Sequence, residues 1–230
     1  TSEIGVYGDF IHELDWSVGE VLDTLDRLKL TETTLVFFSS DNGGVQAYKR
    51  IAHAEIAGHR INGPLRGQKT EVFEGGHREP FIARWPGRVP AASQSRQLIA
   101  LTDVLATCAD LLGLPLPHDG AEDSFSFAPV LLGKPGGTGA RRNLVNDSMR
   151  GVFSIREGPW KLIVGQGGGG SYPQDHAPAP VPDPAEPPGQ LYNLDDDLGE
   201  TKNLYAEQPE RVARLTAMLE KIQKDGRSRP

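Results

Sequence analysis

The segment Asp-Asn-Gly-Gly at positions 41–44 carries the residues of this chain best suited to binding a metal ion. Asp41 offers a carboxylate and Asn42 a carboxamide, and such hard oxygen donors suit calcium or magnesium far better than zinc or copper. The same four residues are also good turn formers, because Asp and Asn side chains bond nearby backbone and glycine tolerates positive φ. The neighbouring residues decide between a metal site and a plain turn.

A glycine-rich stretch at 63–78 brings positive or protonatable side chains into an otherwise acidic protein. These side chains are Arg66, Lys69, His77 and Arg78. The glycines let the backbone approach a ligand closely, and the positive charges suit a tetrahedral oxyanion. Three glutamates, Glu71, Glu74 and Glu79, are interleaved with them. The alternative interpretation is therefore a solvated charge run that pairs internally.

The apolar run Leu-Val-Phe-Phe at 35–38 must position Asp41 and Asn42. It lacks polar alternation, which predicts a strand covered on both faces in a parallel sheet. Ligands bind in the crevice beyond the carboxyl ends of such strands, where residues 41–44 would lie. A second buried strand is predicted at 81–85, where Pro86-Gly87 ends it.

Two helices are predicted to flank this sheet, and alternating strands and helices indicate an α/β architecture. Residues 7–28 place apolar side chains every three or four positions, which predicts a core-facing helix with His12 on its exposed side. A second helix is predicted at 103–112, with Thr102 as its N-cap. Its apolar face includes Cys108, the only cysteine, which we interpret as a buried thiol.

The pattern changes after Gly133, where short strands are predicted at 143–145, 152–156 and 160–164. These strands indicate a small antiparallel sheet. The closing segment at 209–224 is predicted to be a helix that packs back on the main body.

Residues 166–189, which begin with four successive glycines after Gln166, are predicted to be a mobile insertion that includes a solvated His176. We therefore divide the chain into the C-terminal part of an α/β domain at 1–133 and a small α+β subdomain at 134–230. The Gly/Pro-rich insertion lies at 165–189.

Composition excludes some function classes. The formal net charge of −7 argues against binding nucleic acid or anionic membranes. The sequence has no apolar run long enough to span a bilayer, and residues 1–8 lack the pattern of a signal peptide. His53 and His59 fall in a long loop at 45–60, so they are candidates for substrate contact.

Several ordered motifs resemble the sulfatase family of the alkaline-phosphatase-like superfamily. Around the candidate site the matching motifs are Ser-Asp-Asn-Gly at 40–43, Leu-Arg-Gly-Gln-Lys at 65–69, Glu-Gly-Gly at 74–76, Arg-Glu-Pro-Phe-Ile at 78–82 and Trp-Pro-Gly at 85–87. Downstream, Gly-Pro-Trp-Lys-Leu at 158–162 and Gln-Leu-Tyr-Asn-Leu at 190–194 are similar to the family's small C-terminal domain. The similarity covers nearly the whole chain and corresponds to the C-terminal half of a sulfatase.

The resemblance implies roles for individual residues. Asp41 and Asn42 would be ligands of a divalent metal, usually calcium in this family, with magnesium as the other option. Lys69 would contact the sulfate as a catalytic and substrate-binding residue, and His77 and Arg78 would shape the pocket rim. The substrate would be a sulfate ester, with a sulfated carbohydrate as one candidate. The family's compartments are periplasmic, extracellular or lysosomal.

The family's nucleophile, a formylglycine made from a Cys/Ser-x-Pro/Ala-x-Arg motif, has no precursor in these 230 residues. We therefore expect the chain to need an N-terminal part of the catalytic domain and to be inactive in isolation. Two alternatives to a sulfuric ester hydrolase stay open. One is a phosphoric ester or phosphonate hydrolase of the same superfamily, and the other is a non-catalytic sulfatase-like binding module.

Overall fold

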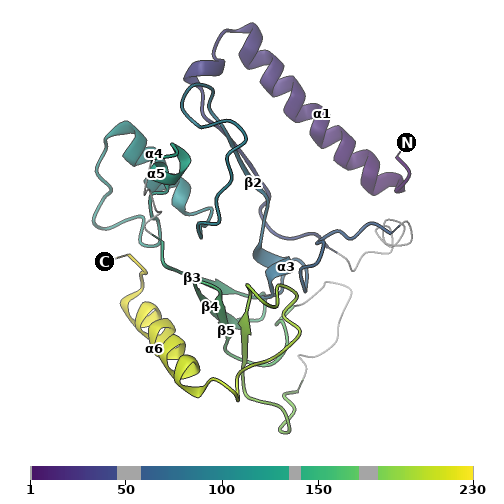
Figure 1. Cartoon of the computed structure of the whole chain (residues 1–230), viewed down its shortest axis with the longest axis vertical. Helices are drawn as coiled ribbons and strands as arrows, with labels where there is room; N and C mark the ends of the chain where they lie inside the picture. Colours follow the sequence, from purple (N-terminus) through teal and green to yellow (C-terminus); the bar gives the residue numbers. More distant parts are fainter. Residues whose placement is uncertain (1, 46–57, 135–140, 171–180, 230) are drawn as a thin grey trace.

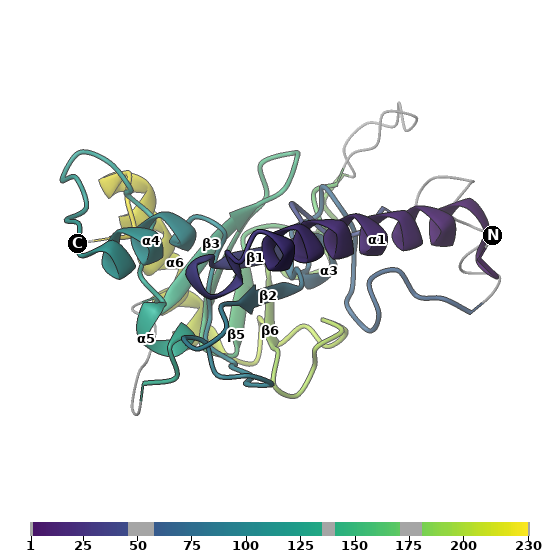
Figure 2. The same ribbon diagram turned by 90° about the horizontal axis from the view of Figure 1, so that it is seen from above.

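The computed structural model describes residues 2–45, 58–134, 141–170 and 181–229, and these build two antiparallel sheets with helices around them (Figure 1). The termini lie on opposite sides of the molecule in both views (Figures 1 and 2). The first part of the chain forms α1 (Gly5–Arg27), η1 (Thr31–Thr33), β1 (Val36–Ser39), α3 (Glu74–His77), β2 (Phe81–Arg84), α4 (Asp103–Leu112) and α5 (Ala128–Leu131). The second part forms β3 (Asn143–Asp147), β4 (Phe153–Glu157), β5 (Trp160–Ile163), β6 (Gln190–Asn193) and α6 (Pro209–Asp225).

The strand predicted before the Asp-Asn-Gly-Gly segment is present as β1, but its pairing differs from the prediction. It pairs with β2 in antiparallel register, with Phe38 opposite Ile82. Both strands are only half-buried, so the predicted doubly covered parallel sheet is not found among the described residues. Aromatic rings from both strands pack on Phe127, which precedes α5. The ring centroids of Phe37 and Phe81 lie 6.0 and 5.6 Å from that of Phe127. This aromatic contact favours apolar residues on both strands.

The predicted small antiparallel sheet is confirmed, with strand order β3-β4-β5-β6. A hairpin at Gly158 joins β4 to β5, as predicted. The helix α6 covers one face of the sheet and presents Val212, Leu215 and Leu219 to the apolar side chains of the strands. The other face carries Ile163 and Tyr192 and meets Val72 and Phe73 of the glycine-rich stretch. The sheet therefore lies between a helix and the segment that carries Lys69.

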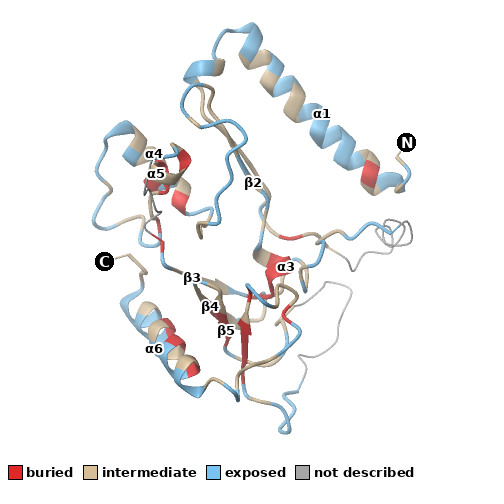
Figure 3. Ribbon diagram, viewed as in Figure 1, coloured by how far each residue is buried: buried red, intermediate tan, exposed pale blue. Residues whose placement is uncertain are grey.

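Two helices form where predicted but bury different faces. Only Gly8 of α1 is buried, so the prediction of a core-facing helix is wrong for the described structure (Figure 3). In α4 the buried residues are Asp103, Ala106 and Thr107, whereas Cys108 is only half-buried. Thr102 does not cap the helix through its side chain. The helix turns its polar Asp103 inward because that carboxylate has a buried partner, Arg141.

The mobile insertion predicted at 166–189 stays a prediction, but the residues that the structure describes on either side of 171–180 make specific hydrogen bonds. The carbonyl of Gly168 accepts a hydrogen bond from the amide of Val72 at 2.9 Å. The side chain of Gln166 donates to the carbonyl of Asp183 at 2.8 Å. Gly168 thereby contacts the glycine-rich stretch that carries Lys69, and Gln166 bridges to Asp183 on the other side of residues 171–180. His176 lies outside the described residues.

Candidate functional site

Backbone hydrogen bonds bring the two sequence segments together. The amide of Gly43 donates to the carbonyl of Gly76 at 3.1 Å, and the amide of Lys69 donates to the carbonyl of Gly44 at 3.3 Å. The segment that follows β1 is thus held against the glycine-rich stretch at two points, Lys69 and Gly76. Asp41 and Asn42 come just before these contacts, so the oxygen donors and the lysine share one region of the fold.

Asn62 fastens this junction, and the sequence analysis missed it. Its Oδ1 accepts from the amide of Gly44 at 2.8 Å, while its Nδ2 donates to the carbonyls of Gly44 at 3.1 Å and Gly67 at 2.9 Å. One carboxamide therefore satisfies three backbone groups from two loops. An asparagine just before a glycine also reads as a turn residue, which hides this role in the sequence.

The glycines of the site let backbone segments approach each other. A Cβ added at Gly43 would lie 1.7 Å from the carbonyl oxygen of Gly75, and one added at Gly75 would lie 2.5 Å from the carbonyl oxygen of Arg66. Any larger residue would force these segments apart. We predicted that the glycines admit a ligand, whereas at these two positions they admit the neighbouring loop.

The acidic residues near β1 fit a cation. Oε1 of Glu79 is buried without a hydrogen-bond partner. Burial, together with the charge of Asp41, raises the pKa of Glu79 to about 7. A bound cation would relieve the repulsion between the two carboxylates. Among the described residues no three acidic, histidine or cysteine side chains form a group that could hold a metal ion, so Asp41 and Asn42 offer only part of a coordination shell.

Two of the arginines in the glycine-rich stretch are occupied by other partners. Nη1 of Arg66 donates to the carbonyl of Glu200 at 2.7 Å and to the hydroxyl of Tyr192 at 3.2 Å. Arg78 lies 3.3 Å from Glu74. The internally paired charge run that the sequence left open therefore describes Arg78, whereas Arg66 bonds residues that are distant in the sequence.

The remaining candidates differ in their surroundings. Lys69 is exposed, and its backbone lies beside Gly44. His77 lies at the end of α3, where burial and the charge of Lys161 lower the pKa of its imidazole, so the neutral ring is favoured. The ring of His59 lies 5.9 Å from that of Tyr7 in α1. His53 falls outside the described residues.

Sequence reasoning missed a buried charge cluster behind the site. Lys161 of β5 lies 3.0 Å from Glu74 and 3.0 Å from Glu200. Burial acts to raise the pKa of Glu74, but the attraction of Lys161, Arg156 and Arg78 exceeds it and lowers that pKa. Burial prevails at Glu200 and, with the nearby negative charge of Glu74, raises its pKa, although Lys161 and the amide of Glu74 act to lower it. The one available signal was a lysine inside the apolar run Trp-Lys-Leu-Ile.

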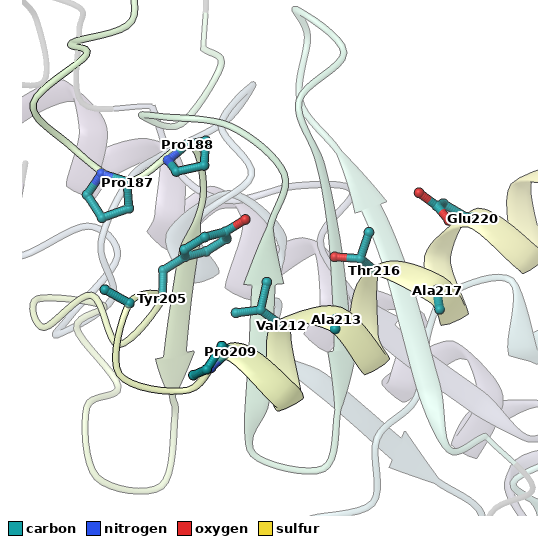
Figure 4. A pocket seen from close by; sticks show the side chains of 10 residues that line it. Pro187, Pro188, Tyr205, Pro209, Val212, Ala213, Thr216, Ala217 and Glu220 are labelled. Carbon is teal, nitrogen blue, oxygen red and sulfur yellow. The ribbon is translucent and has the colours of Figure 1, made fainter.

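A groove of about 740 Å³ lies elsewhere, on the α6 side of the four-stranded sheet (Figure 4). Its walls are mostly apolar and include Pro187, Pro188, Tyr205 and Val212, with Glu220 as the charged residue. None of the candidate site residues lines it. The groove therefore does not belong to the site around Asp41 and Lys69.

No helix in the described part of the chain is long and apolar enough to cross a membrane. A family model described as Sulfatase matches residues 1–114. An N-acetylgalactosamine-6-O-sulfatase of Bacteroides thetaiotaomicron is 37% identical to this chain, over 96% of the chain and 42% of the relative. Human arylsulfatase A is also 37% identical, over 87% of the chain and 39% of the relative.

A solved Bacteroides thetaiotaomicron structure, from work on the metabolism of multiple glycosaminoglycans, matches with a TM-score of 0.82 and 34% identity. The match covers 96% of this chain and 45% of that one. The chain thus spans less than half the length of these relatives. The folds agree, and the α/β organisation is that of alkaline-phosphatase-like enzymes. The chain belongs to the sulfatase family.

Proposed function

We propose that this chain forms part of an enzyme that hydrolyses a sulfate ester with the help of a divalent metal. The observation that carries the proposal is the pair of backbone contacts that join residues 41–44 to the Lys69 segment. They bring a carboxylate, a carboxamide and an ammonium group into one region. Sulfatase relatives that align with nearly the whole chain support the same reaction.

In this proposal Asp41 and Asn42 hold the metal, with calcium preferred and magnesium as the other option. When bound, the ion would neutralise charge on the sulfate oxygens. The carboxylate of Asp41 contributes the negative charge that attracts the ion. The side-chain nitrogen of Asn42 donates to the carbonyl of Gly43 at 3.1 Å, so the side-chain oxygen is the atom that would bind the ion.

Lys69 would be the catalytic residue of this segment. Its ammonium group would stabilise the negative charge that develops on a sulfate oxygen as the ester bond breaks. His77 and Arg78 stay candidates for the pocket rim, although Arg78 pairs with Glu74. The nucleophile would come from outside these 230 residues, because they contain no formylglycine precursor motif.

The substrate that we propose is a sulfated carbohydrate. The name of the Bacteroides thetaiotaomicron relative supports a 6-O-sulfated N-acetylgalactosamine. A direct test incubates the full-length protein with N-acetylgalactosamine 6-sulfate and measures released sulfate, with 4-nitrophenyl phosphate tested in parallel. Sulfate release that EDTA abolishes and calcium restores is expected. Release of phosphate alone would favour the phosphoric ester hydrolase, and release of neither would contradict a hydrolase for these substrates.

Substitutions then assign the roles of the two segments. Lys69→Ala should lower kcat by about a hundredfold, as loss of one charge-stabilising donor does. Asp41→Asn should weaken calcium binding in a calorimetric titration, because the loop keeps its shape but loses a ligand charge. Lys221→Ala, which removes an exposed lysine on α6, is the matched control. Unchanged kcat in Lys69→Ala would remove Lys69 from the mechanism.

A further inference from the structure

Lys161 is the most deeply buried charged side chain of the four-stranded sheet. Its exposed fraction is 0%, and its ammonium nitrogen lies 3.0 Å from Oε1 of Glu74 and 3.0 Å from Oε1 of Glu200. Both glutamates are buried as well. Removing three charges from water is costly, and apolar residues often replace such clusters without loss of stability. Stability alone is therefore a weak reason for this arrangement.

The cluster joins three segments that are distant in sequence. Glu74 begins α3, Lys161 belongs to β5, and Glu200 follows β6. Oε2 of Glu200 also accepts a hydrogen bond from the amide of Glu74 at 2.7 Å. Arg156, opposite Lys161 in the sheet, adds a contact of 3.3 Å to Glu74. The start of α3 is thereby fixed on the sheet by charge and by backbone hydrogen bonding.

Glu200 holds the other end of the Lys69 segment as well. Its carbonyl accepts a hydrogen bond from Arg66 at 2.7 Å. Lys69 lies between Arg66 and Glu74, so both ends of the turn that carries it are attached to one residue. The amide of Gly75 also donates to the carbonyl of Arg66 at 2.7 Å, which closes the turn into a ring of contacts.

From this ring the contacts continue to the candidate metal ligands. Gly76 accepts from the amide of Gly43, and the amide of Lys69 donates to Gly44. A shift of α3 relative to β5 would move Gly76, which is one of the two anchor points of residues 41–44. The geometry of Asp41 and Asn42 therefore depends on where Glu74 is held.

We propose that Lys161 is a positioning residue, which acts through Glu74 and Glu200 to fix the turn carrying Lys69 and the loop carrying Asp41 and Asn42. The inference rests on the proposed function for the importance of that turn. The positioning itself is a property of the metal-free fold. An experiment can therefore contradict the positioning role of Lys161 without contradicting the proposed function, and the reverse also holds.

Amide hydrogen exchange, measured without metal or substrate, tests the positioning in the full-length protein. In Lys161→Met, exchange of the amides in residues 66–76 should rise about tenfold or more, while exchange in α6 changes far less. The matched control is Arg141→Met, which breaks the buried ion pair with Asp103. It should increase exchange in α4 and leave residues 66–76 near the parent rate.

The double variant Lys161→Met/Glu200→Gln covers the case in which the single variant does not fold, because it leaves fewer unpaired buried charges. Unchanged exchange at 66–76 would overturn the proposal. An equal increase in 66–76, β4 and α6 would also overturn it, since that pattern marks a purely structural residue. A calcium titration of the same variants adds a second measurement, in which affinity should fall with Lys161→Met and not with Arg141→Met. Local loss of protection in a protein without sulfatase activity would contradict the proposed function alone.

Discussion

The side chain of Asn62 pairs with the backbone of Gly44 much as one strand residue pairs with another. Its carboxamide accepts from the amide at 2.8 Å and donates to the carbonyl at 3.1 Å. This two-way contact fixes Gly44, which lies two residues after the candidate metal ligand Asn42. Among the described backbone contacts, no carbonyl accepts a hydrogen bond from the amide of Gly44, so Asn62 is its acceptor.

Asn62→Ala should therefore weaken calcium binding and destabilise the fold by about 1–3 kcal/mol, because partly buried backbone groups lose their partners. Denaturant unfolding and calorimetric titration measure the two effects. Asn193→Ala is the control, since that side chain bonds within its own turn. Equal calcium affinity in Asn62→Ala and the parent would show that the pairing does not shape the metal site.

Gly43→Ala should disrupt the contact between β1 and α3. The new methyl group would meet the carbonyl oxygen of Gly75 at 1.7 Å, and overpacking of this kind costs about 1–3 kcal/mol or more. Gly19→Ala is the opposite case, because no atom lies within 4 Å of the added carbon in α1. That change should stabilise by about 0.5–1 kcal/mol. Thermal unfolding in which both variants shift alike would contradict the close approach.

Local signals in the sequence predicted the elements well. The hairpin at Gly158 and the helix that begins at Pro209 follow from turn and helix-start preferences, and both are found where expected. The motifs around Asp41 and Lys69 likewise predicted which segments share a region.

Long-range partners could not be read from the same signals. Lys161 is buried because Glu74 and Glu200 arrive from segments 87 and 39 residues away, as their numbers in the chain show. Asp103 lies on the buried face of α4 because Arg141 forms a buried ion pair with its carboxylate. Gly168 accepts a hydrogen bond from the amide of Val72, although the glycine-rich composition of its segment suggests a linker. In each case the pairing partner, and not the local pattern, decides which face is buried.

His77 should make stability depend on pH. Burial and Lys161 lower the pKa of its imidazole below the ordinary value of 6.5, so the unfolded chain takes up a proton more readily. This contribution to stability is present above pH 6.5 and is lost as pH falls below it. Buried carboxyl groups whose pKa is raised, such as Glu79, act in the opposite sense between pH 4.5 and about 7. Because these effects oppose each other, the pH dependence of the parent's stability must be compared with that of a variant that lacks only the His77 imidazole.

Between pH 7.5 and 5.5 the parent should lose more stability, or gain less, than His77→Gln. Denaturant midpoints at each pH provide the measurement. His12→Gln, at an exposed position of α1, should follow the parent. Identical pH profiles for the parent and His77→Gln would show that this imidazole does not resist protonation in the folded state.

The exposed face of α1 should make the 230-residue chain associate with itself. Val6, Phe10 and Val21 are 75%, 64% and 56% exposed, and their spacing places them on one stripe of the helix. Exposed apolar side chains that gather on one stripe favour association with another apolar surface. Sedimentation should detect concentration-dependent association, and Phe10→Glu/Val21→Glu should weaken it about tenfold or more. Val181→Glu, at a single exposed site away from this helix, should not. A monodisperse parent chain that melts cooperatively above about 60 °C would instead show that the stripe needs no cover for this chain to be stable.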